Sequence, residues 1–157
     1  MASISIDSFS RTIQLSDGSF VNIIIYDTPG AERNKAIIKS YYHRADAILL
    51  VYDISYYTSF KEIIEYYCDI IKNICKKDIP VLLLGNKTEK EIEREVESEE
   101  GIELAHSNNY KFMEASCLKN ENVFEAFETL IELCTYEYQI KNYFKSNSIS
   151  LNKYKNY

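Results

Sequence analysis

Three apolar runs bounded by turn residues constrain the fold of this chain more than any other feature. They are VNIIIYD (Val21 to Asp27), DAILLVYD (Asp46 to Asp53) and IPVLLLGN (Ile79 to Asn86), all of the length and composition of buried strands. A shorter run, YKFMEAS, covers Tyr110 to Ser116. Ahead of them, Ile4 to Leu15 alternates in polarity, and the turn residues around Gly18 predict a hairpin into the first run.

Helical patterns separate these strands. Apolar residues follow helical spacing from Phe60 to Ile74 and again from Val123 to Cys134, which predicts two helices that each pack on one side. The charged segment from Glu89 to Gly101 predicts a solvated helical surface. Strands that alternate with helices indicate an α/β fold, a mostly parallel sheet with helices on both faces.

Polar residues follow the predicted strands. Ligands of such sheets bind beyond the carboxyl ends of the strands. The residues there are Asp27, Asp53, Asn86 and Lys87, with Ser116 and Cys117 after the fourth strand. Each of them taken singly also fits a turn former or a helix cap, so the shared edge is the stronger signal.

Composition excludes several functional classes. A formal net charge of -6 argues against a nucleic-acid binder. The longest apolar run, Ala47 to Tyr52, is far shorter than the roughly 20 residues of a membrane helix, and no secretory signal is recognisable. The four cysteines have no CxxC spacing and there are two histidines, which argues against a zinc site. We expect a cytoplasmic protein with free thiols.

Four motifs resemble those of Rab-type small GTPases. DTPGAER, from Asp27, resembles the switch motif DTAGQER, and SYYHRADAILLVYDIS, from Ser40, resembles the stretch that follows it. LLGNKTE, from Leu83, resembles the NKxD guanine box, and EASC, from Glu114, resembles the ETSA loop. The resemblance implies a three-layer, P-loop-NTPase-like G domain over residues 1–143, followed by a polar tail, residues 144–157, that we expect to be disordered.

The resemblance also implies roles for individual residues. Asp27 would hold the Mg²⁺ of the nucleotide through a water, and Ser3 stands at the position of a magnesium-binding threonine. The backbone N–H of Gly30 would approach the terminal phosphate of GTP. The guanine base of GTP or GDP would meet residues of the last two motifs: Asn86, Lys87, Glu89, Ser116, Cys117 and Leu118. Among them, the backbone of Cys117 would donate to the guanine oxygen.

Four positions depart from the family pattern. Ala31 stands where the family's glutamine orients the attacking water, and losing such a group costs roughly 100- to 1000-fold in rate. Pro29 removes a backbone donor from the switch turn. Glu89 replaces an aspartate that bonds two guanine nitrogens, and Leu118 replaces a lysine. No residue is therefore identified as catalytic, and whether the chain is an enzyme stays open.

The chain contains no phosphate-binding loop. Such a loop needs two glycines five positions apart, followed by Lys and Ser or Thr. The four glycines are Gly18, Gly30, Gly85 and Gly101, and no two of them have this spacing. By alignment of the motifs, this G domain is incomplete at its N-terminus and lacks the first strand, P-loop and first helix. We expect weak or absent binding and hydrolysis of GTP.

The missing strand is central in the family's sheet. Its absence predicts that the hairpin from Ile4 to Asp27 is separated from the strand that starts at Asp46, with apolar edges left unpaired. Self-association through such an open edge is therefore expected.

Three functional readings remain. The first is a Rab-like guanine-nucleotide switch of vesicle trafficking that has degenerated into a protein-interaction module for effectors or regulators. The second is a truncated portion of an ordinary Rab GTPase. The third, an unrelated α/β module such as a phospho-receiver, lacks the clustered acids it needs between Met1 and Leu15. Because the last cysteine, Cys134, lies inside a predicted helix, a lipid anchor is not expected.

Overall fold

The computed structural model describes residues 7–15, 18–28, 35–75 and 79–146, with the side chains of residues 35–38 and 137–146 left aside. The chain divides into two compact units, Met1–Ser40 and Tyr41–Tyr157. The described strands form two sheets, one of two strands and one of three. The sequence predicts two separate groups of strands, and among the described residues no strand joins the two sheets.

The first unit holds a β-hairpin. Strand β1 (Asp7–Gln14) pairs antiparallel with β2 (Phe20–Asp27), with Asp7 opposite Asp27 and Gln14 opposite Phe20. The turn is closed by a bond from the Leu15 N–H to the Ser19 carbonyl, 2.8 Å, and Gly18 adopts a φ of +83°, which glycine takes without strain. Every side chain of the two strands is exposed or half-buried. The predicted hairpin is confirmed.

The second unit is a parallel sheet of order β3-β4-β5, built from β3 (Ile48–Asp53), β4 (Val81–Asn86) and β5 (Lys111–Ala115). Its helices are α1 (Lys35–Arg44), which begins in the first unit, α2 (Tyr57–Glu62), α3 (Cys68–Ile74), α4 (Ser98–Asn108) and α5 (Val123–Ser146). A π-helical turn, Ile63–Tyr67, joins α2 to α3, and a 3-10 segment, Thr88–Glu93, follows β4. The predicted α/β class with a parallel sheet is confirmed.

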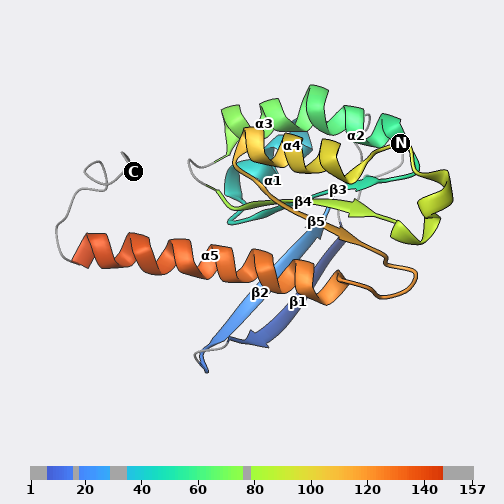
Figure 1. Ribbon diagram of the computed structural model, residues 1–157. Helices are drawn as coiled ribbons and strands as arrows, with labels where there is room; N and C mark the ends of the chain where they lie inside the picture. Colours follow the sequence, from blue (N-terminus) through green and yellow to red (C-terminus); the bar gives the residue numbers. More distant parts are fainter. Residues whose placement is uncertain (1–6, 16–17, 29–34, 76–78, 147–157) are drawn as a thin grey trace. The chain divides into compact units, whose positions relative to one another are not determined.

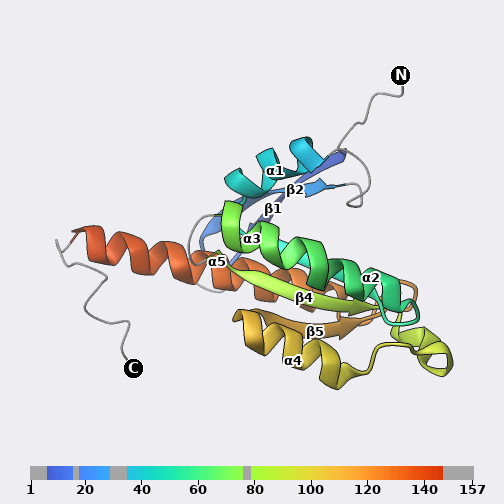
Figure 2. The same cartoon turned by 90° about the horizontal axis from the view of Figure 1, so that it is seen from above.

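Helices cover both faces of this sheet (Figures 1 and 2). Helix α5 packs its Ala126 and Leu130 against Leu82 and Leu84 of β4 and Ala115 of β5. On the opposite face, Tyr52 of β3 meets Phe60 of α2 with ring centroids 4.9 Å apart. Both faces of β4 are thereby buried, which explains why its sequence is a continuous apolar run rather than an alternating one.

The expected helix from Glu89 to Gly101 is wrong in its extent. The chain forms the 3-10 segment Thr88–Glu93, leaves helical geometry, and starts α4 at Ser98. The break has a local cause, because Glu97 and Glu100 form a reciprocal capping box that fixes the start of α4. The expected helix from Phe60 to Ile74 is confirmed as one continuous helical stretch, made of α2, the π-helical turn and α3.

Two simpler expectations can be compared with the structure directly. The four cysteines are free thiols. Within the described ranges, none of the helices combines the length and apolar character that crossing a membrane requires. The predicted domain limit at residue 143 falls inside α5, which ends at Ser146, and the predicted tail beyond that helix lies outside the described residues.

Candidate functional site: a polar rim at the ends of three strands

The carboxyl ends of the three parallel strands lie side by side. In the strand register Asp53 is opposite Asn86, and Asn86 is opposite Ala115, the residue before Ser116. Lys87, directly after β4, has a left-handed φ of 71°, which turns the chain sharply into the 3-10 segment. The predicted convergence of Asp53, Asn86 and Ser116 on one rim is confirmed.

Two hydrogen bonds join the loop after β4 to the loop after β5. The buried hydroxyl of Ser116 donates to the carboxylate of Glu89, and this bond lowers the pKa of Glu89. The backbone N–H of Cys117 donates to Asn86 Oδ1 at 3.2 Å. Ser116 in turn accepts the N–H of Lys119 at 3.0 Å, so the second loop is folded around its serine. We call this group, Asn86, Glu89, Ser116 and Cys117, the base rim.

Asp53 joins the end of β3 to the base rim through Lys87. The Lys87 ammonium lies 2.6 Å from Asp53 Oδ2. The other oxygen, Oδ1, accepts the N–H of Ser55 at 2.9 Å and its hydroxyl at 2.7 Å. Partial burial acts to raise the pKa of Asp53, but the bonds from Lys87 and Ser55 outweigh it and hold this pKa below its ordinary value. The same ion pair raises the pKa of Lys87.

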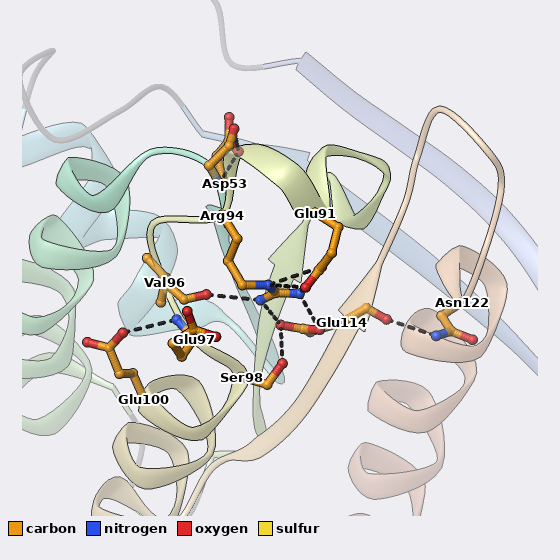
Figure 3. A network of polar contacts seen from close by, with 10 residues as sticks. Asp53, Glu91, Arg94, Val96, Glu97, Ser98, Glu100, Glu114 and Asn122 are labelled. Carbon is orange, nitrogen blue, oxygen red and sulfur yellow. Dashed lines mark hydrogen bonds and ion pairs between the residues drawn. The ribbon is translucent and has the colours of Figure 1, made fainter.

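The half-buried Arg94 connects the segment after β4 to the end of β5. Arg94, whose side chain is 9% exposed, bonds both oxygens of Glu114 at 2.7 and 3.1 Å. It also bonds Glu91 and the carbonyl of Val96, so its guanidinium is surrounded by acceptors (Figure 3). The bonds from Glu114 first, then those from Glu91, raise the already high pKa of Arg94. Such a fully paired guanidinium is rigid.

Glu114 is the second centre of this network. Its carboxylate also accepts the hydroxyl of Ser98 at 2.9 Å, and its carbonyl accepts the side-chain amide of Asn122 (Figure 3). Glu114 precedes Ala115 and Ser116 directly. The network therefore fixes the end of β5 against the segment between Glu91 and Ser98, and with it the spacing of the two loops that form the base rim.

A model of the Ras family matches residues 1–136. The chain therefore belongs to the Ras family of small GTPases. It is 38% identical over 133 residues to the Ras-related protein Rab-15 of Bos taurus, an alignment that covers 85% of this chain and 62% of Rab-15. RABA6b of Arabidopsis thaliana is 40% identical over 128 residues, which cover 82% of this chain and 55% of RABA6b.

A third relative has a similar match. SEC4 of Candida albicans is 35% identical over 133 residues, which cover 85% of this chain and 62% of SEC4. The chain is thus Rab-like, and it spans less than two thirds of the length of these relatives.

Most of the residues that the resemblance predicted to meet guanine lie on one rim of the sheet. Asn86, Glu89, Ser116 and Cys117 are connected by hydrogen bonds, and Lys87 lies between Asn86 and Asp53. Cys117 gives its N–H to Asn86 here, so its expected role as a donor to guanine stays a prediction. Leu118 is exposed. The extra methylene of Glu89 does not prevent its contact with Ser116.

Only some of the residues predicted to bind phosphate or Mg²⁺ lie in the described part of the chain. Gly30, Ala31 and Ser3 lie outside the described residues. Asp27 ends β2 with an exposed carboxylate opposite Asp7, a hard oxygen donor of the kind Mg²⁺ accepts. Among the described residues, no three His, Cys, Asp or Glu side chains gather into a metal site. These residues supply part of a magnesium site at most, and no chemistry is derived through that ion.

Arg94 and Glu114 are the contributors that sequence reasoning missed. A charge run such as Glu89 to Gly101 is usually solvated, so a half-buried arginine within it gives no separate signal. Glu114 did give a signal in the sequence, because a carboxylate in a strand with apolar neighbours requires a polar or charged partner. That reasoning would have predicted a buried cation without identifying which one.

Proposed function

We propose that this chain forms the guanine-recognising part of a Rab-type G domain, that it binds guanine nucleotides weakly, and that it serves vesicle trafficking as a protein-interaction module. The observation that carries this proposal is the base rim, in which Ser116 holds Glu89 and Asn86 accepts from Cys117. Hydrogen bonds among its own residues hold the rim in place, which favours residual recognition of a base, since little further ordering would be needed on binding.

We expect the proposed site to bind the phosphates of a nucleotide weakly. Most of the affinity of P-loop proteins for phosphate comes from backbone N–H groups and a lysine of the glycine-rich loop. The four glycines of this chain do not form that loop. For this chain alone we expect dissociation constants for GTP and GDP of about 1 mM or weaker, near -4 kcal/mol. We expect no measurable GTP hydrolysis.

Titration calorimetry tests the proposal on the full chain. GDP and GTP are titrated with Mg²⁺ present, and ATP is the matched nucleotide with the wrong base. We expect weak binding of GDP that exceeds the binding of ATP, and loss of that difference in Ser116→Ala, which removes the hydroxyl that holds Glu89. A micromolar constant for GDP would show that phosphate is recognised after all, and equal binding of GDP and ATP would remove the base rim from the proposal.

The interaction part of the proposal is supported by the open edge of the sheet. Within the described residues β3 pairs on one side with β4, and Val51 on β3 is 49% exposed. An apolar edge strand is a template for strand addition by an effector, a regulator or a second copy of the chain. We place this role in the cytoplasm, without nucleic acid.

Sedimentation velocity tests the self-association. We expect association that rises with concentration and is reduced by Val51→Lys, because a lysine on an edge strand opposes pairing. Ile102→Lys is the matched control, since Ile102 on α4 is 51% exposed and lies off the strand edge. A monomer at all concentrations, or an equal effect of the two lysines, would contradict this part.

A further inference from the structure

Strand β2 of the hairpin has an open edge on the side away from β1. The bond from the Leu15 N–H to the Ser19 carbonyl makes these residues a hydrogen-bonded pair, and such pairs alternate along an antiparallel ladder. Phe20, Asn22 and Ile24 therefore direct their backbone N–H and C=O groups away from β1. None of the described strands pairs with that side of β2. The side chains of Phe20 and Ile24 are 70% and 55% exposed.

Strand β3 has a second open edge, in the other unit. Ile48 gives its N–H to the carbonyl of Pro80, on the side of β4. Since successive residues of a strand direct their backbone groups to opposite sides, Leu49 and Val51 direct theirs away from β4. The open edge ends at Asp53, whose N–H is bonded to a serine hydroxyl of α2. Among the described strands, β4 is the only neighbour of β3.

The two open edges match in their chemistry. At the centre of each, one residue combines outward-directed backbone groups with an exposed apolar side chain, Ile24 on β2 and Val51 on β3. The outer edge of β1 differs, because its outward-directed residues are all polar: Ser8, Ser10, Thr12 and Gln14. Unpaired apolar edges are templates for strand pairing, whereas polar edges oppose it. The edge of β2 is thus the better match for β3.

A second copy of the chain can bring these edges together. Within one chain, β2 and β3 belong to separate sheets and do not pair. Each copy nevertheless carries both an acceptor edge and a strand that fits it. Strand addition gives backbone hydrogen bonds to both partners and covers the exposed apolar side chains of both edges.

We propose that β2 of one copy of this chain adds to the open edge of β3 in a second copy. The proposal rests on the interaction part of the proposed function and names the strand that occupies the edge. A contact between two different surfaces either closes reciprocally into a dimer or continues from copy to copy. Pairing of β3 with β3 would instead use one edge twice and stop at a dimer.

Mixing two lysine variants of the full chain tests this pairing by sedimentation velocity. Ile24→Lys blocks β2 and keeps the edge of β3, whereas Val51→Lys blocks β3 and keeps β2. We expect each variant alone to weaken self-association by about tenfold or more, because a lysine on an edge strand opposes pairing. An equimolar mixture should form a heterodimer through the one intact contact, and nothing larger.

Two further variants separate the cause of the loss. Ser10→Lys is the matched control, because it adds the same charge on β1, directly opposite Ile24. At a salt concentration of about 0.15 M, where surface charges are largely screened, we expect its self-association to stay within about twofold of the unaltered chain. Ile24→Pro removes the outward-directed N–H without removing a bond of the hairpin ladder, and should weaken association as Ile24→Lys does.

The outcomes distinguish this inference from the proposed function. A monomeric unaltered chain at all concentrations would end both. If the unaltered chain associates and Val51→Lys weakens it while Ile24→Lys does not, or if the mixture stays monomeric, the edge of β3 receives another strand and this inference alone is overturned. Equal weakening by Ser10→Lys would also overturn it, since charge would be the cause. Should either lysine variant not fold, the effect of Ile24→Pro decides.

Discussion

The base rim and the hairpin are two regions of one chain that are stabilised by different kinds of contact. In the rim, Ser116 is buried and bonds Glu89 of another loop, and behind the rim the half-buried Arg94 bonds Glu114. In the hairpin, each residue of β1 faces one of β2 along eight pairs, yet no side chain of either strand is buried. The rim is held by side chains and the hairpin by its backbone.

This difference separates local from long-range stabilisation. A two-stranded hairpin alone is marginal in water, because its ladder and cross-strand pairs give little beyond the entropy they cost. The run Ile23 to Ile25 has the apolar character of a strand buried on both faces, but Ile24 is exposed here. We conclude that substitutions in the rim act on the whole second unit, whereas substitutions in the hairpin act on the hairpin.

The largest effect is expected from Arg94→Met. Removing the guanidinium leaves the partly enclosed Glu114 without its cation, and losing these charged hydrogen bonds costs about 2–3 kcal/mol. The matched control is Arg11→Met in β1, where the residue is exposed and we expect a change under about 0.5 kcal/mol. Urea unfolding of both variants measures the difference. Equal losses would mean that the rim is no more enclosed than the hairpin.

The sequence predicted the framework of both regions for a physical reason. Runs of apolar residues indicate the strands. Because the carboxyl ends of parallel strands meet at one edge of the sheet, Asp53, Asn86 and Ser116 could be placed together at that edge before the structure was known. The family motifs then led us to predict a guanine-base site at that edge. Both inferences depend on local sequence patterns, which can be read from a single sequence.

The other features of the site and the fold depend on contacts that no local sequence pattern indicates. Nothing in the spacing of Arg94 and Glu114 indicates that they meet, because the pair joins segments 20 residues apart. The end of the 3-10 segment and the start of α4 followed from the capping box at Glu97, which competed successfully with the helical propensity of a charged run. The pairing of Lys87 with Asp53 likewise became visible only with the register of β3 and β4.

An intermediate loss of stability is expected from two glycine substitutions, one in the second unit and one in the hairpin, because each destabilises its region by a different mechanism. A Cβ at Gly101 would lie 2.4 Å from the Phe112 ring and 2.7 Å from the Tyr52 hydroxyl oxygen. We expect Gly101→Ala to destabilise the second unit by about 1–3 kcal/mol through overpacking, although alanine favours a helix. Gly18 has open space around it but a φ of +83°, so Gly18→Ala should cost about 1 kcal/mol through backbone strain alone.

Hydrogen exchange distinguishes these two losses. Gly101→Ala should accelerate exchange throughout β3, β4 and β5, whereas Gly18→Ala should accelerate it in β1 and β2. If Gly18→Ala reduced protection in the parallel sheet as strongly as in the hairpin, the two regions would unfold as one unit, and the comparison drawn above would be wrong.

The smallest effect is expected from the ion pair between Asp53 and Lys87, and it depends on pH. Because the pKa of Asp53 in the folded chain lies below its ordinary 3.8, the carboxylate stabilises the fold above that value, and this contribution is lost as the pH falls through the folded pKa. Lys87 is 43% exposed, so we expect at most about 1 kcal/mol at pH 7. Urea unfolding should therefore separate Asp53→Asn from the unaltered chain at pH 7, and the separation should disappear in acid, at a pH below the folded pKa of Asp53. Glu93→Gln, at an exposed pair, should show a smaller separation at pH 7. A gap between Asp53→Asn and the unaltered chain that persisted in acid would mean that Asp53 acts through packing or neutral hydrogen bonds, and that its charge does not hold Lys87.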